Sequence, residues 1–211
     1  MIYISADDYG LSHISSMHIQ QCIDAGVLNK VSVFPNLELI DMQEILKNKE
    51  IKLALHLNCV EGRCMAEASE IPLIVDENGM FKHTFGGLLG RSVFYGKKFK
   101  KQIYKEIKAQ VLFWKKNLPQ GKALYIDSHQ HTHMIPAIFR ALLKVLEDEN
   151  MELEYMRIPV EPLLPYMKTP SLYITYDVVN VIKQWVLRFL WIFNKKLSEK
   201  HTRSRQFFFY S

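Results

Sequence analysis

Cysteine is sparse in this sequence and shows no pattern typical of disulfide-bonded domains. Only Cys22, Cys59 and Cys64 occur in 211 residues. Small secreted domains depend on dense, even-numbered cysteine sets, so an odd count of three points away from that class. Cys59 and Cys64 also lack the second Cys/His pair that a structural zinc site requires. Because no signal peptide precedes the first strand-like run, we expect a reducing, cytoplasmic setting.

The sequence also lacks a long apolar run that is free of charge. The nearest approach is Val178–Phe193, which Lys183, Gln184 and Arg188 interrupt. A membrane-spanning helix needs about 20 mainly apolar residues, so we predict no membrane span. An amphipathic core or lid helix is the favoured interpretation, and a helix that lies in a membrane interface is the alternative.

Concentrated positive charge and a serine-hydrolase motif are missing too. The net charge is +5, but the densest basic run, Gly96–Lys108, has the spacing of a solvated helix face. We therefore expect no nucleic-acid partner. Ser128 lies beside histidines, yet no G-x-S-x-G turn surrounds it, which argues against a serine nucleophile.

Short strand-like runs alternate with helical patterns along the chain. The strand-like runs cover 1–6, 30–35, 51–57, 122–127 and 153–159, and helical patterns cover 12–26, about 41–49, 99–117 and 138–149. This alternation predicts an α/β fold with a parallel sheet, open or closed into a barrel, and we assign residues 1–211 to a single domain. In the first helix the spacing predicts a face with Ile14, Met17, His18, Cys22 and Ile23. Residues 58–96 read as a long loop, a kind of segment that is usually functional.

Ionisable side chains follow four of the strand-like runs. Asp7 and Asp8 come after the first run. The others are His56 and Asn58, then Asp127, Ser128 and His129, and finally Arg157. Because the carboxyl ends of parallel strands meet at one edge of a sheet, we expect these groups to share one rim, where active sites form.

The residue types at this rim favour a divalent metal. Two neighbouring carboxylates repel unless a cation offsets them, so Asp7 and Asp8 suggest one ligand and one base, with a helix-capping turn as the alternative. His129, His131 and His133 alternate and would point the same way in extended chain. Imidazole with carboxylate is a typical ligand set for transition metals, whereas a hydrogen-bonded polar cluster is the competing interpretation. His56 alone would read as a core histidine.

Four segments together resemble a known family. "ADDYGLS", "LALHLNCVEG", "YIDSHQHTHM" and "MRIP" are similar, in order and placement, to the motifs of the YdjC-like carbohydrate deacetylases, the group that includes chitooligosaccharide deacetylase. The similarity covers Met1 to about Glu161. It implies a (β/α) barrel-like fold with the active site at the carboxyl ends of the strands, as in polysaccharide deacetylases.

The resemblance also implies roles for particular residues. Asp8, His56 and His129 would hold the metal, Asp7 would be the general base, and Arg157 would orient it. The family points to Mg²⁺, while the Asp/His/His ligands also suit Zn²⁺ or another transition metal. Substrate contacts or support of the ligands would come from the remaining candidates, Asn58, Asp127, His131 and His133.

The expected reaction is hydrolysis of the N-acetyl group of an N-acetylated amino sugar or oligosaccharide, with release of acetate. Phe81, Phe85 and Phe94 would either stack on sugar rings or pack in the core. The family continues beyond a segment like Gln206–Ser211 to a His-Pro motif that supplies an acid, so we expect the C-terminal part of the domain to be truncated here. The alternative function is a catalytically impaired fragment or metal-containing carbohydrate-binding protein. A homo-oligomer is compatible with the sequence.

Overall fold

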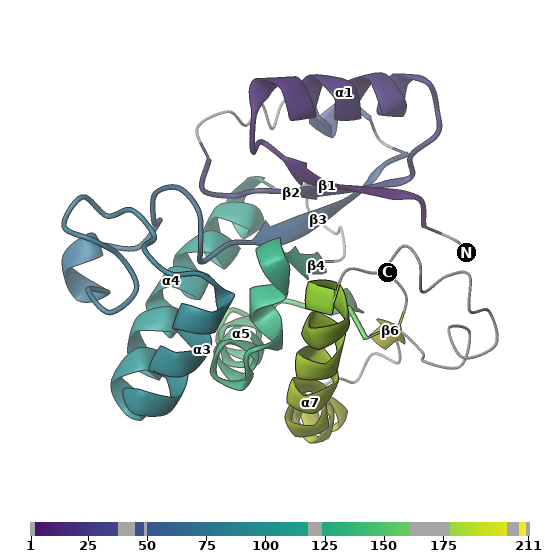
Figure 1. The fold of residues 1–211 in the computed structure, drawn as a ribbon. Helices are drawn as coiled ribbons and strands as arrows, with labels where there is room; N and C mark the ends of the chain where they lie inside the picture. The colour runs from purple at the N-terminus through teal and green to yellow at the C-terminus, as the bar shows by residue number, and fades with distance from the viewer. Residues whose placement is uncertain are drawn as a thin grey trace.

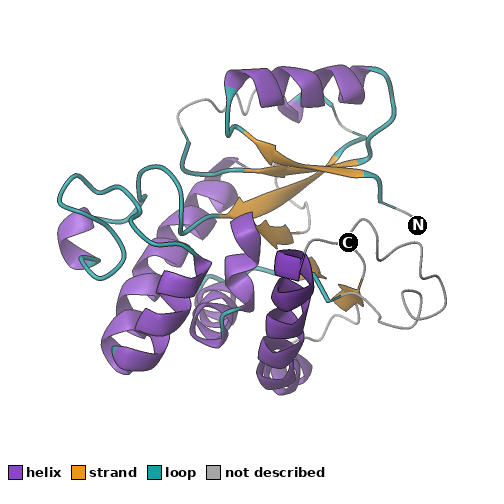
Figure 2. Ribbon diagram, viewed as in Figure 1, coloured by secondary structure: helices purple, strands orange, loops and turns teal. Residues whose placement is uncertain are grey.

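Six parallel strands pair in the order in which they occur along the chain. The computed structural model describes residues 3–37, 45–48, 50–117, 124–160, 178–201 and 207–209. The strands are β1 (Ser5–Tyr9), β2 (Lys30–Val33), β3 (Lys52–Leu57), β4 (Leu124–Ser128), β5 (Leu153–Ile158) and β6 (Phe207–Phe209). Figure 2 shows a helix above these strands and other helices below them and to the left. Sequential order without a reversal is the order of (β/α) barrels rather than of doubly wound sheets.

Helices follow most of the strands, as crossover connections require. They are α1 (His13–Asp24), α3 (Phe85–Phe94), α4 (Gly96–Asn117), α5 (Pro136–Asp148) and α7 (Val178–His201), with 3₁₀ turns η1 (Ala68–Glu70) and η2 (His129–Met134). Local chemistry starts two of them. Ser12 caps α1 by a reciprocal exchange with Ser15, and Pro136 occupies the first turn of α5, where a missing N–H costs nothing.

One face of the sheet packs against the helices. Alternate strand residues, such as Val31, Leu55 and Ile126, join a single apolar core with side chains of α1, α4 and α5. In Figure 1, α1 lies above β1 and β2, whereas α4 and α5 lie below. Because the same sheet face meets helices on opposite sides of the view, the sheet curls with its helices outside. This arrangement confirms the predicted α/β, barrel-like class with parallel strands.

The other face of the sheet carries polar and aromatic side chains, and most of them are buried. Ala54, Tyr125 and Tyr155 form a small second cluster with Tyr3. Nearer the carboxyl ends, the strand pairing places His56 of β3 beside Asp127 of β4. The inner face of the curled sheet therefore changes from tyrosines to ionisable groups toward the rim at which the candidate site lies.

The first strand differs from its prediction. We expected residues 1–6, of which Met1 and Ile2 lie outside the described residues, but β1 is Ser5–Tyr9 and includes both aspartates. Its register against β2 is irregular between Ala6 and Tyr9. Asp8 has a φ of 66°, in the left-handed region. A regular strand would send these two adjacent side chains to opposite faces, so the irregularity lets both aspartates reach the same rim, which the sequence did not anticipate.

Two further expectations were wrong. The end of the predicted loop 58–96 is helical, because Thr84 caps α3 and Leu88 anchors it in the core despite three glycines. In α1 the buried residues are Ile19 and Ile23, whereas Ile14 and Met17 are exposed. The short helix expected at 41–49 falls mostly outside the described residues.

Candidate metal centre

Three side chains from separate elements converge at the rim of the sheet. Asp8, His56 and His129 each offer a ligand atom, and these atoms all lie within 4.8 Å of one another. His56 Nε2 and His129 Nδ1 each lie 3.0 Å from Asp8 Oδ1. Ligand atoms bound at about 2.1 Å to one ion stand about 3.0–3.4 Å apart in neighbouring positions. The two contacts of Asp8 therefore have the spacing of neighbouring ligands on one divalent cation.

His56 supplies independent evidence that this cluster fits a cation. Its contact with Asp8 lacks hydrogen-bond geometry, and both ring nitrogens are buried without a hydrogen-bond partner among the described residues. Buried polar atoms are almost always satisfied, and a bound ion is a recognised partner for those that lack a hydrogen bond. A metal on Nε2 would satisfy that nitrogen.

The charges of the cluster favour ionised Asp8. Burial alone would raise the pKa of Asp8, but the imidazoles of His129 and His56 outweigh it and hold this pKa well below its usual range. For His129, burial opposes protonation, yet Asp8 and Glu61 together raise its pKa. A carboxylate that stays ionised at low pH is well suited to bind a cation.

The histidine-rich segment does not run as an extended chain. His129–Met134 forms η2, in which Gln130 and His131 adopt left-handed conformations. His129 therefore turns toward Asp8, while His133 turns into the interior. The prediction that His129, His131 and His133 point the same way was wrong, because the strand ends at Ser128 and the alternation of extended chain ends with it.

Phe34 holds the two candidate imidazoles in place. This fully buried side chain follows β2, and its ring centroid lies 4.9 Å from that of His56 and 5.0 Å from that of His129. Such edge-on packing fixes the ring orientation of both histidines. The sequence offered no signal for this role, since an apolar residue after a strand reads only as core.

Asp7 faces a different partner from Asp8. Arg157 Nη1 donates to Asp7 Oδ2 at 2.6 Å and to Asp127 Oδ2 at 3.0 Å. Asp127 is buried, and its other oxygen accepts from the backbone N–H of Ser128. Asp7 Oδ1 is buried with no hydrogen-bond partner among the described residues. One oxygen of Asp7 is therefore held by the Arg157 guanidinium, and the other is not.

A second basic side chain, that of Lys30, lies near Asp127. Lys30 is 2% exposed, and its ammonium sits 4.6 Å from the ring centroid of Tyr155. Burial lowers the pKa of Lys30, against the attraction of Asp127. For Asp127, burial would raise the pKa, but the charges of His56, Arg157 and Lys30 hold it below its usual range. Sequence reasoning missed Lys30, because it begins a strand rather than ending one.

Asn58 shapes the loop beside the centre. Its amide accepts from the N–H groups of Val60 and Glu61 and donates to the carbonyl of Glu61. Glu61 Oε2 lies 3.0 Å from His129 Nε2. Asn58 is fully buried, so these contacts make it a support of the loop. Glu61, which the sequence analysis did not single out, brings a second carboxylate to His129.

His131 and His133 are not members of the group formed by Asp8, His56 and His129. His133 is buried and donates from Nε2 to the carbonyl of Arg157 at 2.8 Å, and its Nδ1 accepts from the Ser128 hydroxyl. It therefore fixes the backbone that presents Arg157. His131 Nδ1 is buried without a partner among the described residues, and burial lowers the pKa of His131.

Comparisons with known proteins agree on one family. A family model described as YdjC-like protein matches residues 1–208. Carbohydrate deacetylases are among the relatives, that of Danio rerio at 26% identity over 78% of this chain and 51% of its own length, and that of Xenopus laevis at 27% over 76% and 51%. The bacterial one of Thermoanaerobacter pseudethanolicus is 23% identical over 77% of this chain and 63% of its own length. This chain thus spans about half the length of the vertebrate relatives.

A solved structure supports the fold. A protein of Enterococcus faecalis V583, named for cellobiose-phosphate cleavage, has a TM-score of 0.57 and 22% identity. The match covers 74% of this chain and 57% of that one. At this identity the likeness concerns the fold alone. The family model confirms the resemblance that the four motifs indicated.

Proposed function

Because this chain belongs to the YdjC-like protein family, we propose that it hydrolyses the N-acetyl group of an N-acetylated amino sugar or oligosaccharide and releases acetate. The relatives named carbohydrate deacetylase support this reaction class. The observation that carries the proposal is the convergence of Asp8, His56 and His129 beside an aspartate held by Arg157. A cation that polarises the carbonyl and a base both assist amide hydrolysis, and this arrangement would supply ligands for the cation and a carboxylate for the base.

Asp8, His56 and His129 would hold a divalent cation. When bound, such an ion polarises the acetyl carbonyl and lowers the pKa of a water molecule, and either Mg²⁺ or Zn²⁺ suits this work. Phe34 keeps both imidazoles oriented toward Asp8. Glu61 adds a carboxylate on the far side of His129.

Asp7 would take the proton of the attacking water on its unpartnered Oδ1. Arg157 holds Oδ2 and thereby fixes the direction of the carboxylate. Asp127 in turn anchors Arg157, and Ser32 donates to Asp127 Oδ2 at 3.3 Å. In this proposal Asn58, Asp127 and His133 are supports. His131, with its unpartnered Nδ1, is the remaining candidate to contact substrate.

The candidate sugar-stacking aromatics divide between the two interpretations. Phe81 packs in the core and Phe85 packs partly against it, whereas Phe94 is 84% exposed. Core packing therefore accounts for Phe81. That residues 1–211 make up one domain remains a prediction.

Acetate release from N,N′-diacetylchitobiose, measured together with metal content, tests the proposal. We expect a divalent metal at one equivalent per chain and metal-dependent acetate release. Metal binding with sugar binding but without acetate release would favour the alternative, a metal-containing carbohydrate-binding protein. Acetate release that is unaffected by removal of the metal would refute the proposed chemistry.

A further inference from the structure

The outer face of α7 carries a row of large apolar side chains that the protein leaves exposed. We call this row the outer stripe, and its members are Val181, Ile182, Trp185, Phe189, Ile192 and Phe193. Their exposed fractions run from 39% for Val181 to 65% for Ile192, with 59% for Trp185. Spacings of three and four residues place them on one side of the helix. Phe189 and Phe193 contact each other edge to face, with ring centroids 5.1 Å apart.

The inner face of α7 is already packed, and its last turns are polar. Trp191 packs edge to face against Phe139 of α5. Asn194 is fully buried and donates to the carbonyl of Met134 in η2, and Ser198 is 2% exposed. The inner face buries Leu187, Leu190 and Trp191, but at its last turns the helix buries Asn194 while it exposes Ile192 and Phe193. A contiguous apolar surface of this kind marks a contact with another apolar phase or partner.

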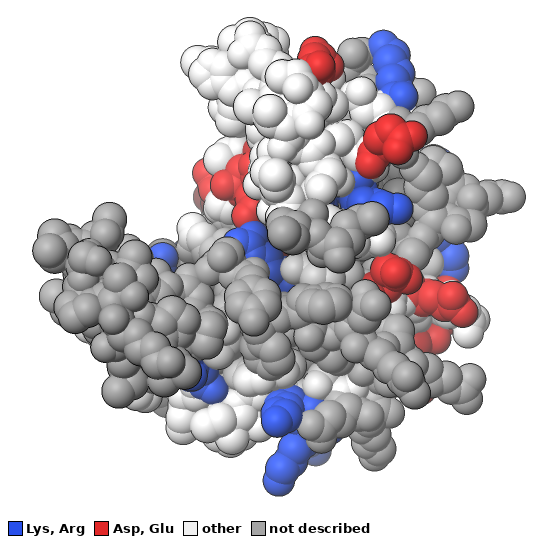
Figure 3. All heavy atoms as spheres, turned by 90° about the vertical axis from the view of Figure 1, so that its right-hand side faces the viewer, with Lys and Arg blue, Asp and Glu red and all other residues white. Residues whose placement is uncertain are grey.

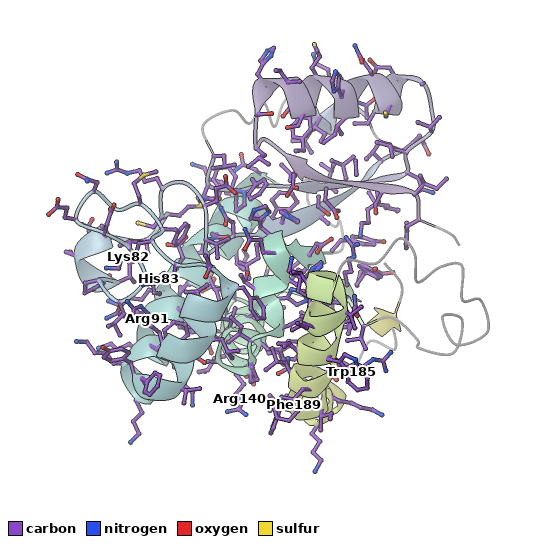
Figure 4. All side chains as sticks on the ribbon, in the orientation of Figure 1. Lys82, His83, Arg91, Arg140, Trp185 and Phe189 are labelled. Carbon is purple, nitrogen blue, oxygen red and sulfur yellow. The ribbon has the colours of Figure 1, made fainter. Side chains whose placement is uncertain are left out.

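Within residues 178–198, which Asp177 and Glu199 flank, all the charged side chains are basic. Residues 178–198 contain Lys183, Arg188, Lys195 and Lys196 and no aspartate or glutamate. Lys183, Lys195 and Lys196 are exposed. Figure 4 shows Trp185 and Phe189 projecting outward from α7, with Arg140 at the same lower side of the molecule. On the face drawn in Figure 3, the charged groups at the lower end are basic, and the acidic ones lie higher.

We propose that the outer stripe docks this protein on an anionic membrane surface, with α7 lying parallel to the bilayer. Exposed Trp, Phe and Ile beside lysines are the composition of a helix that enters the headgroup region. Anionic lipids add attraction for each nearby lysine. Among the described residues no helix has the length and apolar content to cross a bilayer, so the contact is peripheral. This inference does not depend on the proposed function.

A second copy of the chain fits this surface less well. Pairing two α7 helices through their outer stripes would bring Lys195 and Lys196 toward like charges, with no acidic residue in 178–198 to offset them. The stripe is also a convex ridge on a helix, which a deformable bilayer can accommodate. Because Asn194 bonds directly to η2, the docked helix would adjoin the element that carries His129.

Vesicle co-sedimentation of the 211-residue protein tests the proposal. Vesicles would contain phosphatidylcholine alone or with about one third phosphatidylglycerol. We expect binding to the anionic vesicles that weakens as salt is raised. The double variant Trp185→Ser/Phe189→Ser should reduce the partition coefficient by at least about 10-fold. Lys195→Glu/Lys196→Glu should reduce it by about 10-fold as well.

Two controls separate docking from general stickiness or misfolding. Ile14→Ser/Met17→Ser changes an equally exposed apolar pair on α1 and should leave binding unchanged. Trp114 and Trp191 are buried, so brominated lipid should quench mainly Trp185. Trp185→Phe should therefore keep binding and lose most of the quenching, even if the double serine variant fails to fold.

Several results would overturn the proposal. These are equal binding to neutral and anionic vesicles, equal losses for the α1 and α7 variants, or quenching that survives Trp185→Phe. A concentration-dependent dimer that Trp185→Ser/Phe189→Ser dissociates would assign the stripe to a second copy. Protection of Trp185 from aqueous quenchers in a longer parent protein would assign it to the chain itself.

Discussion

Asp7 and Asp8 are neighbours in sequence and yet face different partners. Asp8 lies between two imidazoles, and Asp7 is held by the guanidinium of Arg157. In a regular strand the two side chains would point to opposite faces, and the left-handed backbone of Asp8 lets both reach the same rim. A non-glycine residue in this conformation costs about 1–3 kcal/mol, and such costs concentrate at functional sites. The backbone therefore brings both carboxylates to the rim, where they meet different partners.

Substitution of each aspartate in turn should separate metal binding from proton transfer. Asp8→Ala removes a charged ligand and should weaken metal affinity by at least about 10-fold. Asp7→Asn keeps the shape and its contact site for Arg157 but removes basicity, so acetate release should fall by about 10²–10⁴-fold while metal stays bound. Isothermal titration with metal and an acetate assay in an active form of the protein measure the two effects. If Asp7→Asn loses metal while Asp8→Ala keeps it, the roles are reversed.

His133 should make stability depend on pH. Burial lowers its pKa to about 4 from the ordinary 6.5, so the folded protein keeps this ring neutral where the unfolded chain takes up a proton. The contribution of neutral His133 to the unfolding free energy is therefore fully present above about pH 6.5. It is lost as the pH falls toward 4, and the loss amounts to roughly 3 kcal/mol. Urea unfolding at several pH values measures the loss. His133→Gln can still donate to the Arg157 carbonyl and should flatten the pH dependence.

The control for this experiment is His18→Gln, which changes an exposed histidine on α1. It should leave the pH dependence of unfolding as it is in the unaltered protein. An equal flattening in both variants would show that the slope does not come from His133.

At this scale the sequence predicted the groups that end strands and little else. Asp7, Asp8, His56 and His129 could be grouped because parallel strands bring their carboxyl ends together. Phe34 and Lys30 could not, because their roles depend on which ring or carboxylate packs against them in three dimensions. Glu61 lies in a loop, and its distance from His129 follows from the turn that Asn58 builds. The direction of His131 and His133 required the geometry of η2.

At the scale of elements, α4 anchors the long loop that borders the centre. Three buried polar residues, Gln102, Glu106 and Gln110, recur every four positions along the helix. They accept from the backbone N–H groups of Leu73, of Met65 and Ala66, and of Asn58, respectively. Part of the loop's backbone is thus satisfied by the side chains of one helix face.

Removal of Glu106 should loosen this loop. Glu106→Ala leaves the N–H groups of Met65 and Ala66 without their acceptor, and a buried unpaired group costs about 1–3 kcal/mol. Burial also raises the pKa of Glu106, which shows that its buried charge is itself unfavourable. Removal of this charge recovers part of the free energy that the lost hydrogen bonds cost. We expect a net loss of about 2–4 kcal/mol in unfolding free energy and faster proteolysis within residues 58–73.

The matched control for the loop is Lys101→Ala, an exposed change on the same helix. It should alter the unfolding free energy by less than about 0.5 kcal/mol and leave the proteolysis rate unchanged. A Glu106→Ala protein with normal stability and normal proteolysis would contradict the anchoring role.

Element type was predictable here where the hydrophobic pattern was long. In α5 the expected apolar positions Ile138, Leu142, Leu143 and Leu146 are all buried. The beginning of α3 was not predictable, because glycines at 86, 87 and 90 favour a loop by propensity, and tertiary burial of Leu88 overrides them. In α1 the apolar spacing fitted two faces, and only packing on the sheet selects Ile19 and Ile23.

At the scale of the whole molecule, the curled sheet separates two environments. Its outer face packs on α1, α4 and α5, and its inner face leads from tyrosines to the ionised groups at the rim. The parallel direction of the strands could be inferred from the alternating elements, because parallel neighbours need crossover connections. The curvature could not, because it depends on how the helices pack together. The candidate ligands come from β1, β3 and η2, which this curvature brings into contact.

Metal binding should therefore stabilise the fold as a whole. A ligand set drawn from three elements exists only in the folded state, so a cation at 100 times its dissociation constant adds about 2.7 kcal/mol to the unfolding free energy. For a chain of this size that corresponds to a rise in Tm of roughly 5–10 °C. Thermal unfolding with Zn²⁺ or Mg²⁺, and again with a chelator, measures it. Asp8→Ala should lose most of the rise, whereas Asp24→Ala, an exposed acid on α1, should keep it. If Asp8→Ala is stabilised as much as the unaltered protein, the cation binds elsewhere, and the convergence of Asp8, His56 and His129 has another cause.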